Sequence, residues 1–280
     1  MLGSFLITLR EGLEAALIVG IVLAYLARTD NRHGFKHVWL GTVLAVVVSL
    51  MAGAIIYLTA RELSGRAEEV FEGSAMFLAT VVLTWMVFWM RRQAVNIKAH
   101  LYAQVQSAVG SGSSLGLVVL AFVAVAREGV ETALFVFAAT QVAESALLAT
   151  AGAALGIVAA VAIGYTLYKG TYRLNLRVFF DVTGILLIVF AAGLLAHGIH
   201  EFHEAGLLPE VVEHVWDING VLPEQSAFGR FLTAMFGYNG NPSLLEVVAY
   251  LTFLVVVLAA YFRRPAISKK APVDRASISA

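Results

Sequence analysis

The sequence predicts an all-α protein that crosses a membrane seven times, and three observations support this prediction. Of the 280 residues, 60% are hydrophobic and 14% are charged, whereas a soluble domain has about 25% charged residues. The apolar residues form continuous runs, close to the ~20 residues that a spanning helix needs. These runs do not alternate in polarity, as the strands of a membrane β-barrel do.

The apolar runs divide the chain into seven spans and the segments between them. We place the spans at roughly 2–27, 37–60, 72–90, 115–140, 145–169, 178–199 and 244–263. The first span is not a signal peptide, because it lacks a basic start and charged residues interrupt it from Arg10 to Glu14. We therefore expect it to remain in the mature protein.

Composition excludes several classes of function. The formal net charge is +0, which gives no sign of a nucleic-acid partner. There is no cysteine, so disulfides, thiolate metal sites, iron–sulfur clusters and cysteine nucleophiles are excluded. The chain has no G-x-x-x-x-G-K-[ST] loop for ATP hydrolysis. Membrane lipid is the expected surrounding, and no tightly bound cofactor is expected.

The distribution of charge orients the spans. Basic residues gather in the loops after spans 1, 3 and 5 and in the tail 264–280; those in the loops are Arg28, Arg32, Lys36, Arg91, Arg92, Lys98, Lys169, Arg173 and Arg177. The opposite side has three arginines, Arg61, Arg66 and Arg230. The positive-inside rule therefore predicts an external N-terminus and a cytoplasmic C-terminus. The loop 200–243 is acidic and is predicted to lie outside.

A five-residue motif occurs twice in the chain. Span 1 contains Arg10-Glu11-Gly12-Leu13-Glu14 and span 4 contains Arg127-Glu128-Gly129-Val130-Glu131. A weaker match relates Phe71-Glu72 in span 3 to Phe180-Asp181 in span 6. The same order of motifs in spans 1–3 and 4–6 predicts an internal repeat.

The two predicted repeats, residues 1–109 and 115–199, are joined by the Gly- and Ser-rich linker 110–114. Span 1 and span 4 would cross the membrane in opposite directions, so the repeats are inverted. Inverted repeats are typical of transporters, whose site lies near the midplane where the repeats meet. The seventh span, 244–263, is an extra helix that we expect to serve in packing.

Helical geometry places the charges of each motif on one side of its helix. Successive residues are about 100° apart, so Arg10, Glu11 and Glu14 share one arc. Arg10 and Glu14 are spaced to form an ion pair. Gly12 lies on the opposite side, where a missing side chain lets another helix approach. The same arguments apply to the second motif.

If the motifs face each other, four carboxylates surround one space, those of Glu11, Glu14, Glu128 and Glu131. The arginines Arg10 and Arg127 would offset two of the four negative charges. Carboxylate oxygen favours hard cations such as ferric iron, magnesium, calcium or manganese. The alternative is a clamp of arginine and glutamate that fixes helix packing.

Further acids and histidines are candidate gates. We interpret Glu72 as an outer gate and Asp181 as an inner one. The alternatives are a helix N-terminal acid that complements the helix dipole at Glu72, and an ion pair between Asp181 and Arg177.

The end of span 6 is a candidate site for metal capture at the outer mouth. Its four residues share a 100° arc if the helix continues; they are His197, His200, Glu201 and Glu204. Their spacing does not fit the H-E-x-x-H signature of zinc proteases. The alternative is a solvated helix end.

The paired motifs in a seven-span chain resemble the bacterial branch of the oxidase-dependent iron permease family, over roughly residues 1–262. The run Phe71-Glu72-Gly73 also looks like the third span of that family. The resemblance implies that iron is the transported substrate and that both motifs bind it. It further implies a separate extracytoplasmic iron oxidase or iron donor, since this chain has no oxidase signature.

We therefore expect an iron permease of the cytoplasmic (inner) membrane, not an enzyme, importing iron as the ferric ion after oxidation outside. One alternative is a transporter of another divalent metal, such as manganese or zinc. A second is an intramembrane metalloenzyme with a metal at His197, His200 and Glu201. A third is a purely structural membrane subunit. The sequence leaves the oligomeric state open, including a homo-oligomer.

Overall fold

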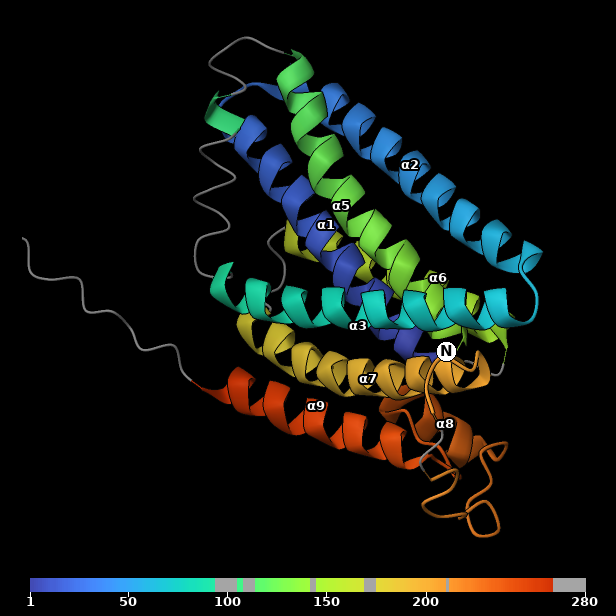
Figure 1. Ribbon diagram of the computed structural model, residues 1–280. Coiled ribbons are helices and arrows are strands. Elements are labelled where there is room, and N and C mark those ends of the chain that lie inside the picture. The colour runs from blue at the N-terminus through green and yellow to red at the C-terminus, as the bar shows by residue number, and fades with distance from the viewer. Residues whose placement is uncertain (94–104, 108–113, 142–144, 169–174, 210–211, 264–280) are drawn as a thin grey trace, which may run out of the picture.

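The computed structural model describes residues 1–93, 105–107, 114–141, 145–168, 175–209 and 212–263. Within these residues every regular element is a helix (Figure 1). The elements are α1 (Leu2–Arg28), η1 (Arg32–Gly34), α2 (Phe35–Glu62), α3 (Arg66–Gln93), α5 (Ser114–Gln141), α6 (Ala146–Tyr168), α7 (Leu176–Glu204), α8 (Ala227–Phe236) and α9 (Leu244–Phe262). Most of the linker 110–114, the basic loop residues Lys98, Lys169 and Arg173, and the tail 264–280 lie outside the described residues.

Each predicted span coincides, within a few residues, with one long helix. Five of these helices are long and apolar enough to cross a membrane, namely α2, α3, α6, α7 and α9. The other two, α1 and α5, are as long, with 27 and 28 residues. Each of these two carries one arginine and two glutamates inside the helix, so composition alone does not mark it as a span. Seven crossings therefore remain a prediction.

The helices extend beyond the apolar runs at two ends. α3 begins at Arg66, before the expected residue 72, and α7 continues to Glu204, beyond the expected residue 199. Hydropathy falls at these polar residues, but backbone hydrogen bonds continue through them. Glu68 and Glu69 also place negative charge in the first turn of α3, where the helix dipole favours it.

The segment 200–243, which the sequence analysis treats as a loop, contains the short helix α8. Ser226 caps its first turn, accepting a hydrogen bond of 2.9 Å from the backbone N–H of Gly229. Gly237 ends the helix in the left-handed conformation, with φ of 65°. Since α8 is only 10 residues long, it is too short to cross a membrane.

The long helices pack in three pairs (Figure 1). α1 lies along α6 and α2 lies along α5, each pair parallel: Met1 contacts Gly152 and Ala16 contacts Gly164 in the first pair. α3 and α7 are antiparallel, because Gly73 contacts Phe202 at one end. α9 packs on α7.

α1 and α5 cross at the centre of the bundle and run antiparallel. Near one end of this contact Leu26 and Leu117 both lie against Gly34, and further along Glu11 faces Glu128 and Glu131. Leu26 and Leu117 belong to an apolar cluster shared by α1, α2 and α5. The central crossing thus brings the two charged motifs into one region of the molecule.

A second apolar cluster fills the space between α3, α5, α7 and α9. Its fully buried members include Met76, Leu83, Phe135 and Leu187. In contrast, the outward faces of the bundle are apolar and exposed, as at Leu50 on α2, which is 69% exposed. An apolar exterior of this extent suits contact with lipid.

Glycines allow the closest helix contacts. A Cβ at Gly12 would lie 2.8 Å from the Cβ of Ala160 on α6, and a Cβ at Gly129 would collide with the side chain of Ser49 on α2. Both motif glycines therefore face the neighbouring helix, as the sequence predicts, and their charged neighbours face the opposite side.

We expect Gly156→Ala to destabilise the contact between α1 and α6. An added Cβ would lie 2.5 Å from the carbonyl oxygen of Phe5 and 2.9 Å from the backbone nitrogen of Leu9. Backbone atoms cannot turn aside, so the variant should lose roughly 1–3 kcal/mol of stability. The measurement is the Tm of the purified protein in detergent.

The matched control is Gly20→Ala in α1, where an added Cβ meets nothing within 4 Å. This substitution should leave the Tm unchanged or raise it, because alanine is the better helix former. An equal fall in Tm for both variants would contradict the packing argument.

Candidate metal site

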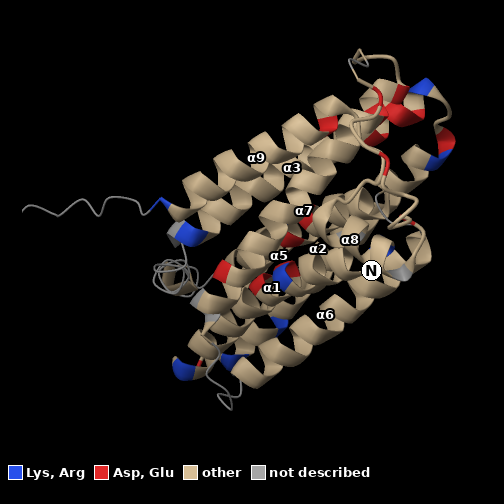
Figure 2. Cartoon of the chain, turned by 90° about the horizontal axis from the view of Figure 1, so that it is seen from below, with Lys and Arg blue, Asp and Glu red and all other residues tan. Residues whose placement is uncertain are grey.

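The charged motifs lie at the crossing of α1 and α5. Figure 2 shows these charges in the middle of the bundle, apart from the charged residues at its two ends. We name these ends the acidic end, where α3 and α9 begin and α7 ends, and the basic end, where α3 and α9 end and α7 begins. Burying ionisable groups inside an apolar bundle costs several kcal/mol unless they are compensated. The geometry of the motifs shows which groups compensate each other.

Both expected ion pairs are present. Arg10 Nε lies 3.1 Å from Glu14 Oε1, and Arg127 Nε lies 2.9 Å from Glu131 Oε1. Each pair joins residues four apart on one helix, at charge-assisted hydrogen-bond distance. The pairs offset the charge of Glu14 and Glu131 and leave the other acid of each motif without an arginine of its own.

Three acids converge in the space between the helices. One carboxylate oxygen from each of Glu11, Glu128 and Glu131 lies within 4.8 Å of the others. Among the described residues, this is the one group of three or more acids or histidines that is gathered so closely. Glu14 was predicted as a fourth member; it is also buried, but it is outside this group.

The oxygens of this group lack partners. Both side-chain oxygens of Glu11 and the Oε2 atoms of Glu128 and Glu131 are buried without a hydrogen-bond partner. Buried carboxylate oxygens without partners are costly, and a bound cation would compensate them. Since every donor is a carboxylate, the site suits a hard cation.

The two arginines have different surroundings. Arg10 is 1% exposed, and its Nη1 atom has no hydrogen-bond partner. The Arg127 side chain is 33% exposed, and its guanidinium lies over two indole rings of α3. The ring of Trp89 is 4.3 Å away and that of Trp85 is 5.5 Å away. The site is therefore not symmetric.

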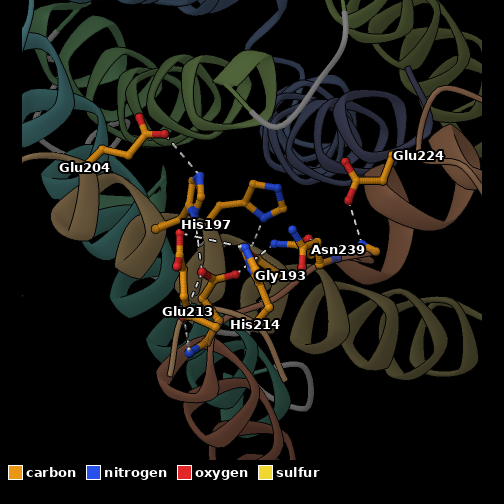
Figure 3. Close-up of polar contacts among 12 residues, drawn as sticks. Gly193, His197, Glu204, Glu213, His214, Glu224 and Asn239 are labelled. Atoms are coloured by element: carbon orange, nitrogen blue, oxygen red, sulfur yellow. Dashed lines mark hydrogen bonds and ion pairs between the residues drawn. The ribbon is translucent and has the colours of Figure 1, made fainter. Parts of the chain in front are cut away.

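The histidine and glutamate cluster lies at the acidic end (Figure 3). α7 does continue through it, as the shared arc requires. His197 Nδ1 lies 3.1 Å from the backbone oxygen of Gly193, and His200 Nε2 lies 3.4 Å from Glu204 Oε1. Glu201 lies beside Gly73 of α3, close to Glu72. The structure does not bring these predicted ligands to a single point.

The centre of this region is Glu246, which the sequence analysis did not identify. Its side chain is buried at the start of α9 and contacts three partners. The hydroxyl of Ser243 and the amide of Asn239 each donate to it at 2.9 Å, and His200 Nδ1 lies 3.3 Å away. The spacing S-x-x-E at Ser243 and Glu246 is a helix-capping pattern, and this signal was available in the sequence.

The two predicted gates have partners at opposite ends. Glu72 lies near the side chain of Gln141, at the end of α5. Asp181 accepts a hydrogen bond of 3.2 Å from the hydroxyl of Tyr261 on α9. The side chain of Arg177, the alternative partner of Asp181, lies outside the described residues. α9 thus binds α7 at both ends in addition to packing against it.

Comparison with known proteins identifies related chains. The model of the iron permease FTR1 family matches residues 1–270. Ferrous iron permease EfeU of Escherichia coli O157:H7 is 42% identical over 267 residues, which cover 95% of this chain and 96% of the relative. The EfeU of Yersinia pestis is 41% identical, over 95% of this chain and 94% of its own. No solved structure matches the chain significantly.

We expect Glu246→Ala to destabilise the acidic end. The change leaves the donors of Ser243 and Asn239 without their acceptor, a loss of roughly 1–3 kcal/mol. The Tm in detergent should fall, and limited proteolysis should cut faster within residues 212–243.

Glu204→Ala is the control for this prediction. Glu204 is 56% exposed and pairs with His200 at the surface, where an ion pair contributes about 0–1 kcal/mol. Its Tm should change little. If the two variants were equally stable, the buried network would not be what holds this end together.

Proposed function

Because the chain belongs to the iron permease FTR1 family, we propose that it imports iron through the site formed by Glu11, Glu128 and Glu131. Iron uptake and a multi-pass location in the inner membrane follow from the family and from the apolar helices. The route through the paired motifs is our proposal. The observation that carries it is the convergence of three carboxylates, two of them buried and one partly buried, with four buried oxygens that have no partner.

We further propose an inverted repeat of α1–α3 and α5–α7. In this repeat α1, α2 and α3 correspond to α5, α6 and α7. The counterpart of the pair formed by α1 and α6 is therefore the pair formed by α5 and α2, and both pairs are parallel. The same correspondence leaves the antiparallel pairs α1 with α5 and α3 with α7 as they are. This pattern of contacts supports two halves related by a two-fold axis in the membrane plane.

Charge supports the proposed direction of transport. The acidic end carries the acids that begin α3 and end α7, and acidic surfaces raise the local concentration of cations. With this end outside, iron would pass Glu72 and Glu201 and then reach the three-acid site. There carboxylate oxygens would replace its water. Rocking of the halves would open the site toward Asp181 and the cytoplasm.

We propose that the transported ion is ferric and that a separate extracytoplasmic oxidase or iron donor supplies it. The donor set supports the oxidation state, because three carboxylates are hard ligands and no sulfur or imidazole is present among them. The relatives are named ferrous iron permeases, so ferrous iron is the competing substrate.

A transporter of manganese or another hard divalent metal is the second candidate, because the same carboxylates bind such ions. Competition by each metal against iron uptake in vesicles separates the two. The metalloenzyme alternative has less support, since Glu204 and Glu246 both pair with His200. We therefore propose transport and not catalysis.

Glu128→Gln should abolish iron uptake. The amide keeps the size of the side chain but removes one of three charges from the site, and an amide oxygen is a weaker ligand. We expect at least a tenfold loss of initial rate in proteoliposomes, which corresponds to about 1.4 kcal/mol of activation free energy. Uptake is measured with radioactive iron and normalised to inserted protein.

The matched control is Glu213→Gln, at a carboxylate that is 72% exposed in the segment 212–243. It removes the same charge far from the helix crossing, so uptake should be close to that of wild type. Normal uptake by Glu128→Gln would disprove the proposed route.

Uptake with the oxidation state imposed tests the identity of the ion. Vesicles with iron held ferric by a weak chelator should take it up faster than vesicles with iron held ferrous by ascorbate. The same comparison with Glu128→Gln corrects for leakage. Faster uptake of ferrous iron by wild type would favour the competing substrate, with the route unchanged.

A further inference from the structure

We propose that Trp85 and Trp89 are positioning residues that hold the Arg127 guanidinium when Glu131 turns to the metal. This inference rests on the proposed function and assigns different roles to the two motifs. Glu131 becomes the ligand that moves, whereas Glu14 stays with Arg10. The argument begins with what Glu131 does in the structure.

Glu131 has two roles that compete. Its Oε1 atom is bound by Arg127 at 2.9 Å, while its Oε2 atom is buried without a partner. It is also one of the three acids whose oxygens converge. A cation at that site would attract the whole carboxylate and repel the guanidinium next to it. A cation bound through Oε2 alone would leave the Arg127 contact in place, whereas binding by both oxygens, the mode we propose, requires Arg127 to give up its partner.

A guanidinium without a partner is costly in this environment, because few polar groups are available to it. The faces of aromatic rings are an exception, since their negative potential attracts a cation within about 6 Å of the ring centre. Trp89 and Trp85 lie at 4.3 and 5.5 Å from the Arg127 carbon Cζ, both within this range. The two indoles stack on each other, with centres 6.2 Å apart. The guanidinium therefore already lies where it would be stabilised without Glu131.

The first motif lacks this arrangement. Among the described residues, three arginines lie over an aromatic ring: Arg61, Arg91 and Arg127. Arg10 is not among these arginines and is 1% exposed, so it has neither a ring to receive it nor space to move. Its ion pair with Glu14 is accordingly fixed. The two motifs, although nearly identical in sequence, therefore differ in how readily the arginine can leave its glutamate.

The chemical consequence is a shift in population. Without the indoles, Arg127 remains longer on Glu131, and the binding-competent state with Glu131 free is less populated. The apparent affinity for the metal falls by the same factor. The maximal rate depends on later steps and should change less. A structural defect would instead lower the maximal rate per vesicle and leave the half-saturating concentration unchanged.

The test is the concentration dependence of iron uptake in proteoliposomes for Trp89→Leu and for the double variant Trp85→Leu/Trp89→Leu. We expect the half-saturating iron concentration to rise about fivefold in Trp89→Leu and further in the double variant. Trp89→Phe keeps an aromatic ring, so its half-saturating iron concentration should be close to the wild-type value. This concentration does not depend on how much protein inserts, so lower abundance does not obscure the result.

Trp39→Leu is the matched control. Trp39 is 53% exposed on α2, much as Trp85 is 56% exposed on α3, but no arginine of the described residues lies over it. A half-saturating concentration that is unchanged in the double variant, or raised equally by Trp39→Leu, overturns the inference. So does a loss of uptake in both Trp89→Leu and Trp89→Phe. If Glu128→Gln abolishes uptake while the Trp89 variants keep the wild-type concentration, the proposed function stands and this inference alone fails.

Discussion

The structure depends on the need to compensate six charged side chains, four of them buried, where two apolar helices cross. Two arginines cannot neutralise four ionised carboxylates, so the crossing either keeps negative charge or must take up protons or a cation. The ion pairs of Arg10 with Glu14 and of Arg127 with Glu131 remove part of that charge and fix where the remainder lies. What remains is a set of oxygens without partners, which is an unstable arrangement for a merely structural core and a suitable one for a cation.

Close packing behind α1 and α5 keeps these charges directed toward each other. Gly12 faces α6 and Gly129 faces α2, and at both positions the neighbouring helix occupies the space of a side chain. Neither helix can rotate about its axis without pushing a Cβ or a charged group into this contact. The same glycines that permit the approach therefore set the direction of the carboxylates. Packing and ligand geometry are one constraint, which is why the motif contains both kinds of residue.

Much of this could be predicted from the sequence, because it depends on local periodicity. The helices follow from apolar runs, and the ion pairs and the direction of the glycines follow from the spacing within five residues. The convergence of Glu11, Glu128 and Glu131 without Glu14 could not be predicted. It depends on how far α1 is shifted along α5, which is set by long-range packing. The role of Glu246 was missed for a different reason, since its S-x-x-E pattern indicates a cap and gives no sign of the distant partner His200.

The contacts of α9 limit how the proposed rocking can occur. Near the acidic end Glu246 lies 3.3 Å from His200 of α7, and near the basic end Tyr261 donates to Asp181 of the same helix. Arg91 of α3 also lies 4.3 Å from the ring of Tyr261. Since α9 is fastened to α7 at both ends, a movement of α7 carries α9 with it as one unit. If the halves move as proposed, the contact between them on this side of the bundle is that of α3 with α7, and the contact of Arg91 with Tyr261 is one that such a movement must break or carry along.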